Sequence, residues 1–307
     1  MRNAAAAIAL TALLATSSLP LRAQETPAPR DSSSSSGTEW FPGDFAVAPL
    51  LAFPLEIRPG AALLWAERDI DDSIDGWNLE ARVAIGLRLP VVRFQEEAPG
   101  RPAIELGFEV GVWSRFFMES LEKEQIDTDW KIGVPLGLRY RIWDFRVTLQ
   151  HVSSHLGDDY LNDNPQDVFQ SSREGFELLL GVRPGFDARV YVGGDLNLGR
   201  SEDFITPEDP REPIVIFTTV EAWAFRFGAE WDQTRWGSKR IAPFAAANFE
   251  INEFTDRIAT LLKAGASFRV KTVRFYLDIE YHSGPSSMGQ FRTVDETWVG
   301  LNFMGEL

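Results

Sequence analysis

The sequence predicts an all-β protein, a transmembrane antiparallel β-barrel of about 12 strands. Apolar residues alternate with polar ones over long runs, short connections alternate with long ones, and no stretch approaches 18 consecutive apolar residues. Several runs reach 11 residues or more, whereas a soluble strand usually has about 5–6. A tilted strand that crosses a bilayer needs roughly 9–11 residues. Strands rather than helices are therefore the expected membrane-crossing elements.

The amino-terminal residues are interpreted as export and linker segments. Residues 1–23 combine a positive charge, an apolar run and the small residue Ala23, which is typical of a secretory signal peptide cut after that residue. Residues 24–38 are rich in proline and serine and predict a linker. We interpret residues 39–59 as an N-terminal periplasmic segment, with insertion into the lumen as the alternative, and residues 60–307 as the barrel. The expected location is the outer membrane.

Each predicted strand has one apolar and one polar face, because its side chains alternate with a period of two. In order, the strands are residues 61–67, 79–89, 104–112, 130–140, 143–153, 176–182, 188–198, 215–231, 241–251, 258–270, 273–281 and 297–303. An even number returns both ends of the chain to one side of the membrane. A soluble β-sandwich alternates in the same way, but its strands are shorter.

Composition limits the partners and the chemistry. The formal net charge is -15 and the chain has no cysteine, so neither nucleic acid binding nor thiolate metal sites and disulfides are expected. The polar faces carry both charges, as suits a narrow lumen crossed by ion pairs: Glu80, Arg82, Arg88, Glu105, Glu109, Arg115, Lys131, Arg139 and Arg146. Tryptophans are expected in aromatic girdles at the membrane interfaces: Trp65, Trp77, Trp113, Trp130, Trp143, Trp231 and Trp298.

One strand carries residues capable of chemistry on its apolar face. From Trp143 the apolar residues occupy odd positions, and the same phase continues into His151 and Ser153. Residues two apart share a face and lie roughly 6.6 Å apart, so an imidazole there can reach a neighbouring hydroxyl, as acyl transfer requires. On the following strand the apolar phase extends back to Glu174. Neighbouring antiparallel strands would bring Glu174 to His151, where it could orient the imidazole.

The motif has family resemblances. The residues HVS at 151–153 resemble the His-x-Ser motif of the outer-membrane phospholipase A family, which implies a twelve-stranded barrel, a lipid-facing catalytic triad and a calcium requirement. They are also similar to the motif of the lipid A 3-O-deacylases, eight-stranded barrels with a His-x-Ser pair and a glutamate. These likenesses imply His151 as base, Ser153 as nucleophile and Glu174 as the orienting group. The chain departs from phospholipase A at Ser154 and His155, where that family has Asn-Gly.

A longer stretch has a third resemblance. The string HVSSHLGDDY, together with PLLAFPLEIRPGAAL near the start, resembles an exported family known as a domain of unknown function. That resemblance implies no activity.

Other interpretations remain open at this point. The histidines and serines could be solvated strand-end residues of a non-catalytic barrel with a structural, binding or narrow-pore role. A metal site is a further interpretation, with His151, His155, Asp158, Asp159, Asp163 and Asp167 as candidate ligands and Ca2+ as the cofactor. The expected partners are phospholipid and lipopolysaccharide of the outer membrane, the barrel assembly machinery and a second copy of the chain.

Overall fold

The computed structural model describes residues 37–68, 76–95, 101–119, 123–158, 160, 168–204, 214–215, 221–255, 257–271 and 273–306. The predicted signal peptide and most of the predicted linker lie outside these residues. No helix among the described residues has the length and apolar character needed to cross a membrane.

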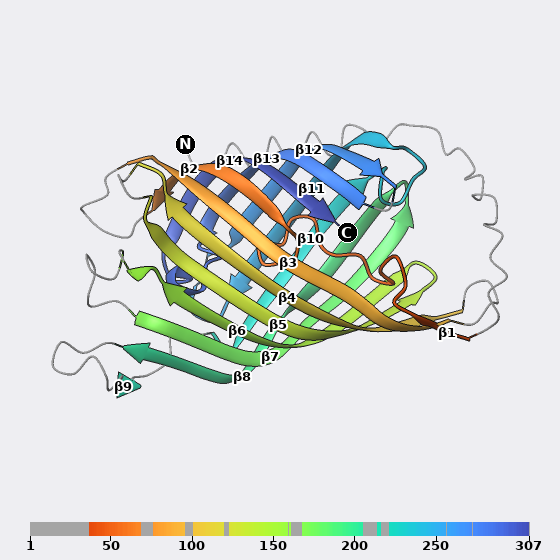
Figure 1. The fold of residues 1–307 in the computed structure, drawn as a ribbon, viewed down its shortest axis with the longest axis horizontal. Helices are drawn as coiled ribbons and strands as arrows, with labels where there is room; N and C mark the ends of the chain where they lie inside the picture. The colour runs from red at the N-terminus through yellow and green to blue at the C-terminus, as the bar shows by residue number, and fades with distance from the viewer. Residues whose placement is uncertain are drawn as a thin grey trace. The chain divides into compact units, whose positions relative to one another are not determined.

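Twelve antiparallel strands of the described chain close into a barrel, which confirms the predicted fold (Figure 1). Each strand pairs with its neighbour in sequence, and β14 pairs with β2 to complete the circle. The barrel strands are β2 (Gly60–Arg68), β3 (Asn78–Gln95), β4 (Ala103–Phe117), β5 (Gln125–Tyr140), β6 (Trp143–Leu156), β7 (Val168–Gly185), β8 (Ala188–Phe204), β10 (Trp223–Asp232), β11 (Ile241–Asn252), β12 (Ala259–Val270), β13 (Val273–Pro285) and β14 (Asp295–Glu306).

Two short strands lie outside this circle. β1 (Gly37–Trp40) pairs with the end of β3, and β9 (Ile214–Val215) pairs with the end of β8. The sequence predicts one strand over residues 215–231, but the structure separates β9 from β10, which begins at Trp223. β7 begins at Val168, eight residues before its predicted start at Phe176. Polar residues in this extension hid it, because they interrupt the apolar alternation.

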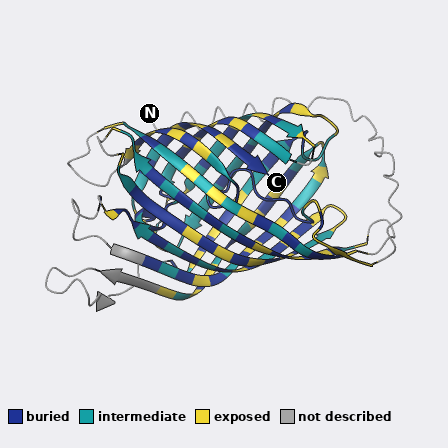
Figure 2. Cartoon of the chain, viewed as in Figure 1, coloured by how far each residue is buried: buried dark blue, intermediate teal, exposed yellow. Residues whose placement is uncertain are grey.

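The wall is apolar outside and charged inside, which is the inverse of a soluble barrel. Along β4 and β6 buried and accessible residues alternate, and Figure 2 shows a similar checkerboard on the coloured strands that face the viewer. The charged residues predicted to face the lumen are buried or partly buried there. Their ion pairs cross between strands, as between Lys131 and Glu177 at 2.9 Å. Such pairing is needed because an unpaired buried charge is costly.

The prediction of aromatic girdles is wrong for two of its tryptophans. Trp113 and Trp298 are only 3% and 1% exposed and share the phase of the charged luminal residues on their strands. Trp298 stacks on His282 with ring centroids 5.2 Å apart. Trp65, Trp77, Trp130 and Trp143 are exposed on the outer face, as expected. The face that a tryptophan occupies therefore follows the alternation along its strand and not its distance from the strand end.

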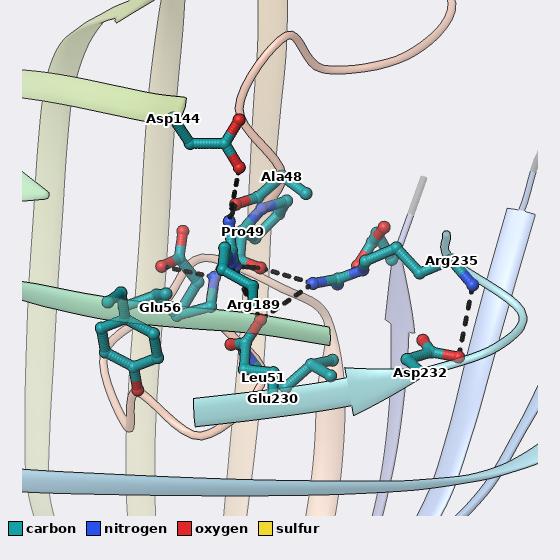
Figure 3. Close-up of polar contacts among 12 residues, drawn as sticks. Ala48, Pro49, Leu51, Glu56, Asp144, Arg189, Glu230, Asp232 and Arg235 are labelled. Atoms are coloured by element: carbon teal, nitrogen blue, oxygen red, sulfur yellow. Dashed lines mark hydrogen bonds and ion pairs between the residues drawn. The ribbon is translucent and has the colours of Figure 1, made fainter. Parts of the chain in front are cut away.

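Residues 45–58, called here the luminal segment, pass through the inside of the barrel (Figure 3). The Arg189 guanidinium donates to the backbone oxygens of Ala48 and Pro49 at 2.8 and 2.9 Å. Arg88 and Arg146 donate to the Glu56 carboxylate at 2.9–3.0 Å. This part of the predicted periplasmic segment therefore lies in the lumen. The physical reason is that arginines of the wall donate hydrogen bonds to backbone oxygens of the segment. In a periplasmic position water would have to form those hydrogen bonds.

Candidate functional site

Strand β6 presents the predicted site residues in the expected phase. Residues at even positions from Asp144 to Leu156 are buried, and residues at odd positions are accessible on the outer face. His151 and Ser153 thus lie outside, two and four residues beyond Leu149, which is 54% exposed in the apolar band. Ser154 lies inside and is 1% exposed. The period of two in an extended strand is the reason that adjacent serines occupy opposite faces.

The structure brings His151 and Glu174 together. The two residues are register partners on β6 and β7, and the Nδ1 atom of His151 lies 2.9 Å from the Oε1 atom of Glu174. Their side chains are 44% and 55% exposed on the outer face. A carboxylate can only accept, so Nδ1 is the donor in this contact, and Nε2 is the ring nitrogen that Glu174 does not engage. A neutral imidazole held in this way would carry its free lone pair on Nε2, as a general base needs.

A local irregularity helps to place the Glu174 carboxylate. The pairing of β7 with β8 shifts register between Glu174 and Gly175, where the chain forms a bulge. On β8, Gly199 is the register partner of Glu174. A Cβ atom at Gly199 would lie 2.4 Å from Oε2 of Glu174, so the glycine leaves the space that the carboxylate occupies. Gly199 was not predicted as a site residue because its role depends on pairing across strands.

Ser153 lies between an aromatic residue and a second hydroxyl. Its register partners are Trp130 on β5 and Ser172 on β7. Trp130 is 50% exposed on the outer face, and tryptophan of this kind favours the membrane–water interface. Ser153 forms no hydrogen bond with any described residue, so the structure places it on the same face as His151 but does not join the two side chains. Ser172 was missed by the sequence analysis because the predicted strand began after it.

The inner face behind the site is held by a buried network. The Ser154 hydroxyl donates to the Asp129 carboxylate. The backbone nitrogen of Gly289 donates to the same carboxylate at 3.0 Å, and the Gln290 side-chain amide donates to the Ser154 backbone oxygen at 2.6 Å. The turn η1 (Gly289–Phe291), between β13 and β14, is thereby attached to the end of β6 from inside.

The predicted metal ligands are not brought together as a site within the described chain. His155 lies on the outer face of β6, and Asp158 is exposed beyond the end of that strand. Asp159, Asp163 and Asp167 lie outside the described residues. The described histidine, aspartate and glutamate side chains form no group of three or more suited to a metal ion. A Ca2+ site at this end of β6 therefore stays a prediction, because several of its candidate ligands lie outside the described residues.

Comparisons with known proteins agree with this architecture. The chain belongs to the family described as "Protein of unknown function (DUF1207)", which matches residues 16–304. Its fold is similar to outer membrane phospholipase A from Escherichia coli, with 17% identity, a TM-score of 0.52, and coverage of 85% of this chain and 98% of that one.

A second similar structure is the Salmonella typhi outer membrane phospholipase dimer with bound calcium. It has 17% identity, a TM-score of 0.50, and coverage of 82% of this chain and 92% of that one. At this identity both likenesses concern the fold alone. No curated protein matches the sequence.

Proposed function

We propose that this protein is an outer-membrane lipid-ester hydrolase with its site on the outer surface of the barrel. The observation that carries the proposal is the contact between His151 and Glu174 beside an unbonded serine, Ser153, on the same face. A strand-end histidine that served only solubility would need no carboxylate in register with it. The likeness of the fold to outer membrane phospholipase A supports the membrane location.

The first half of the reaction uses Ser153 and His151. The Ser153 Oγ atom attacks the ester carbonyl carbon while His151 Nε2 takes the hydroxyl proton. The tetrahedral intermediate then expels the alcohol, which receives that proton from the imidazolium. Glu174 stabilises the imidazolium through its contact with Nδ1. The products are an acylated Ser153 and a lipid that lacks one acyl chain.

The second half returns the enzyme to its starting state. A water molecule gives a proton to His151 Nε2 as its oxygen attacks the acyl carbon. The proton then passes to Ser153 Oγ as the acyl bond breaks, and a fatty acid leaves. Both halves need Nε2 of His151 free of other partners, and no described residue bonds to it.

The depth of the site favours lipids as the substrate class. Trp130 is in register with Ser153, and an interfacial tryptophan marks the level of the headgroups and ester groups. Phospholipids and the acyl esters of lipopolysaccharide both carry ester bonds at this level. We infer that the substrate enters from the membrane rather than through the lumen, which the luminal segment occupies.

A Ca2+ ion would supply polarisation of the ester carbonyl. Residues near the end of β6, His155 and Asp158 among them, remain proposed ligands together with Asp159 and Asp163.

Two protein partners complete the proposal. The similar Salmonella typhi structure is a dimer, and we propose that a second copy of this chain is a partner here. Chemical cross-linking in isolated membranes would test this. The barrel assembly machinery is the proposed insertion partner, because closed barrels need help to enter the membrane.

The test of the proposed function is release of fatty acid from phospholipid micelles by the purified protein. The assay is run once with EDTA and once with about 5 mM calcium, which exceeds the dissociation constants of weak extracellular calcium sites. Release that depends on Ser153 supports a hydrolase. A folded protein that releases no fatty acid from phospholipid or lipopolysaccharide under either condition would favour the non-catalytic barrel, which has the same fold.

A further inference from the structure

We propose that the lumen contains a binding site for a small free oxyanion such as inorganic phosphate, with Arg58 as its main ligand. This site lies inside the barrel and is separate from the outer face that carries His151. It is independent of the proposed hydrolase activity.

The first observation is a buried arginine without an anionic partner. Arg58 is 6% exposed and ends the luminal segment. Within the described part of the chain it forms no ion pair and no hydrogen bond, and its Nη1 atom is buried without a partner. Arginine stays charged in proteins, so neutralisation cannot relieve this. A buried unpaired charge is strongly destabilising, and it therefore calls for a ligand.

The carboxylates in its surroundings are already shared by other cations. Glu56 accepts from Arg88 and Arg146 at 2.9–3.0 Å. The Glu306 carboxylate pairs with Arg235 and Arg274. Both glutamates therefore act on Arg58 only from beyond hydrogen-bonding distance. An added anion would therefore form the direct hydrogen bonds to Arg58 that Glu56 and Glu306 do not form.

The second observation is a cavity of about 40 Å³ that Arg58 lines, between the luminal segment and the wall. Its charged lining consists of Arg58, Arg82, Lys263 and Glu56. Three cations thus face one carboxylate, and that carboxylate is already paired. Arg82 and Lys263 share Glu280, with Lys263 Nζ 2.8 Å from its Oε2 atom. Lys263 also lies 4.0 Å from Asp278.

The chemistry of the lining selects the class of ligand. The guanidinium group presents several N–H donors in a plane, which match the oxygens of phosphate, sulfate or a carboxylate. Lys263 adds a point charge, and Asn302, whose side-chain amide donates to the Asp278 carboxylate at 3.0 Å, also lines the cavity. The space suits an ion of a few atoms, since one water needs roughly 10–15 Å³ of such volume. A phospholipid headgroup with its glycerol and acyl chains would not fit beside the luminal segment.

The experiment compares wild type, Arg58→Gln and a control, Arg141→Gln, in a phosphate-free detergent. Arg141 is exposed in the turn between β5 and β6, so the control loses the same charge outside the lumen. The unfolding temperature of each protein is measured at increasing concentrations of inorganic phosphate. Titration calorimetry then gives the dissociation constant for phosphate. Wild type and Arg141→Gln should bind phosphate, and Arg58→Gln should bind it at least about tenfold more weakly, as loss of a charged hydrogen-bond donor predicts.

A second readout follows from the unpaired charge. Without phosphate, Arg58→Gln should unfold at a higher temperature than wild type, because it removes an uncompensated buried charge. Added phosphate should reduce or reverse the difference in unfolding temperature between Arg58→Gln and wild type, because it binds wild type more tightly. If Arg58→Gln does not fold, Lys263→Gln takes its place and should weaken phosphate binding as well.

Three outcomes would overturn the proposal. One is no phosphate binding by wild type. Another is equal binding by wild type and Arg58→Gln, which means adventitious binding elsewhere. The third is binding of glycerol 3-phosphate without binding of inorganic phosphate, which would assign the site to a headgroup rather than a free ion.

Discussion

The Nδ1 atom of His151 lies 2.9 Å from the Oε1 atom of Glu174, across two neighbouring strands and on the outer face of the barrel. The residues are 23 positions apart in sequence, yet they are direct register partners. Pairing of this kind is rigid, because the ladder of backbone hydrogen bonds fixes both Cα positions. The outer surface thus holds an oriented imidazole next to Ser153, and this relationship gives most of the predictions below.

The substitutions Ser153→Ala and His151→Ala should each lower lipid hydrolysis by at least about 10³-fold, because the nucleophile and base act as a unit. Release of radiolabelled fatty acid from micelles measures this. Neither side chain packs in the lumen, so both variants should still migrate faster on a gel unheated than boiled. Ser154→Ala is the matched control, since its hydroxyl faces inward to Asp129. Loss of activity in Ser154→Ala with survival of Ser153→Ala would contradict the assigned face.

The substitution Glu174→Gln should leave residual activity, with an effect about 10- to 100-fold less severe than Ser153→Ala, as expected for an orienting group. The amide keeps the size of the side chain but not its charge, so the imidazolium loses its stabilisation. The measurement is the pH profile of hydrolysis as well as its rate. An unchanged rate and profile would remove Glu174 from the mechanism.

The substitution Gly199→Ala should reduce activity without unfolding the barrel. Its new Cβ would meet Oε2 of Glu174 at 2.4 Å, and the flexible end of that side chain is what must move. The carboxylate would then leave His151 while both backbones stay in place. Gly137→Ala serves as a comparison, because its Cβ would lie 3.4 Å or more from its neighbours. Activity in Gly199→Ala equal to that of Gly137→Ala would show that the position of the carboxylate is unimportant.

The substitution Glu56→Gln should destabilise the protein by about 3–5 kcal/mol, the usual effect of removing one partner from a buried ion pair. Arg88 and Arg146 would face each other across an uncharged amide. Urea-dependent loss of the heat-modifiable form measures the change. Glu67→Gln, on the exposed face of β2, should have no comparable effect. Equal midpoints for the two variants would mean that the luminal segment contributes little to stability.

Wild-type protein should show little or no steady conductance in planar lipid bilayers. The luminal segment and the wall residues that bind it, such as Arg189, which pairs with Glu230 at 2.7 Å, occupy much of the interior. Single-channel recording provides the measurement. Large, stable, ohmic channels would instead support a porin role and would mean that residues 45–58 leave the lumen in a bilayer.

The sequence alone determined most of the strand pattern and the face of most residues on a strand. A period of two is a local property, so alternation from Trp143 was enough to put His151 and Ser153 outside and Ser154 inside. The pairing of His151 with Glu174 could also be expected, because consecutive antiparallel strands are neighbours. The number of strands followed from counting long alternating runs.

Only the tertiary structure decided which residues meet across the lumen and where the pairing of neighbouring strands is irregular. The contact of Gly199 with Glu174 depends on a bulge in strand pairing, which has no signal in alternation. Trp298 and Trp113 face inward, although their places near strand ends suggested girdles. The burial of Arg58 required the luminal segment to be seen in place, because residues 45–58 have no regular period. Such contacts join residues far apart in the chain, and their geometry is set by closure of the barrel rather than by any local pattern.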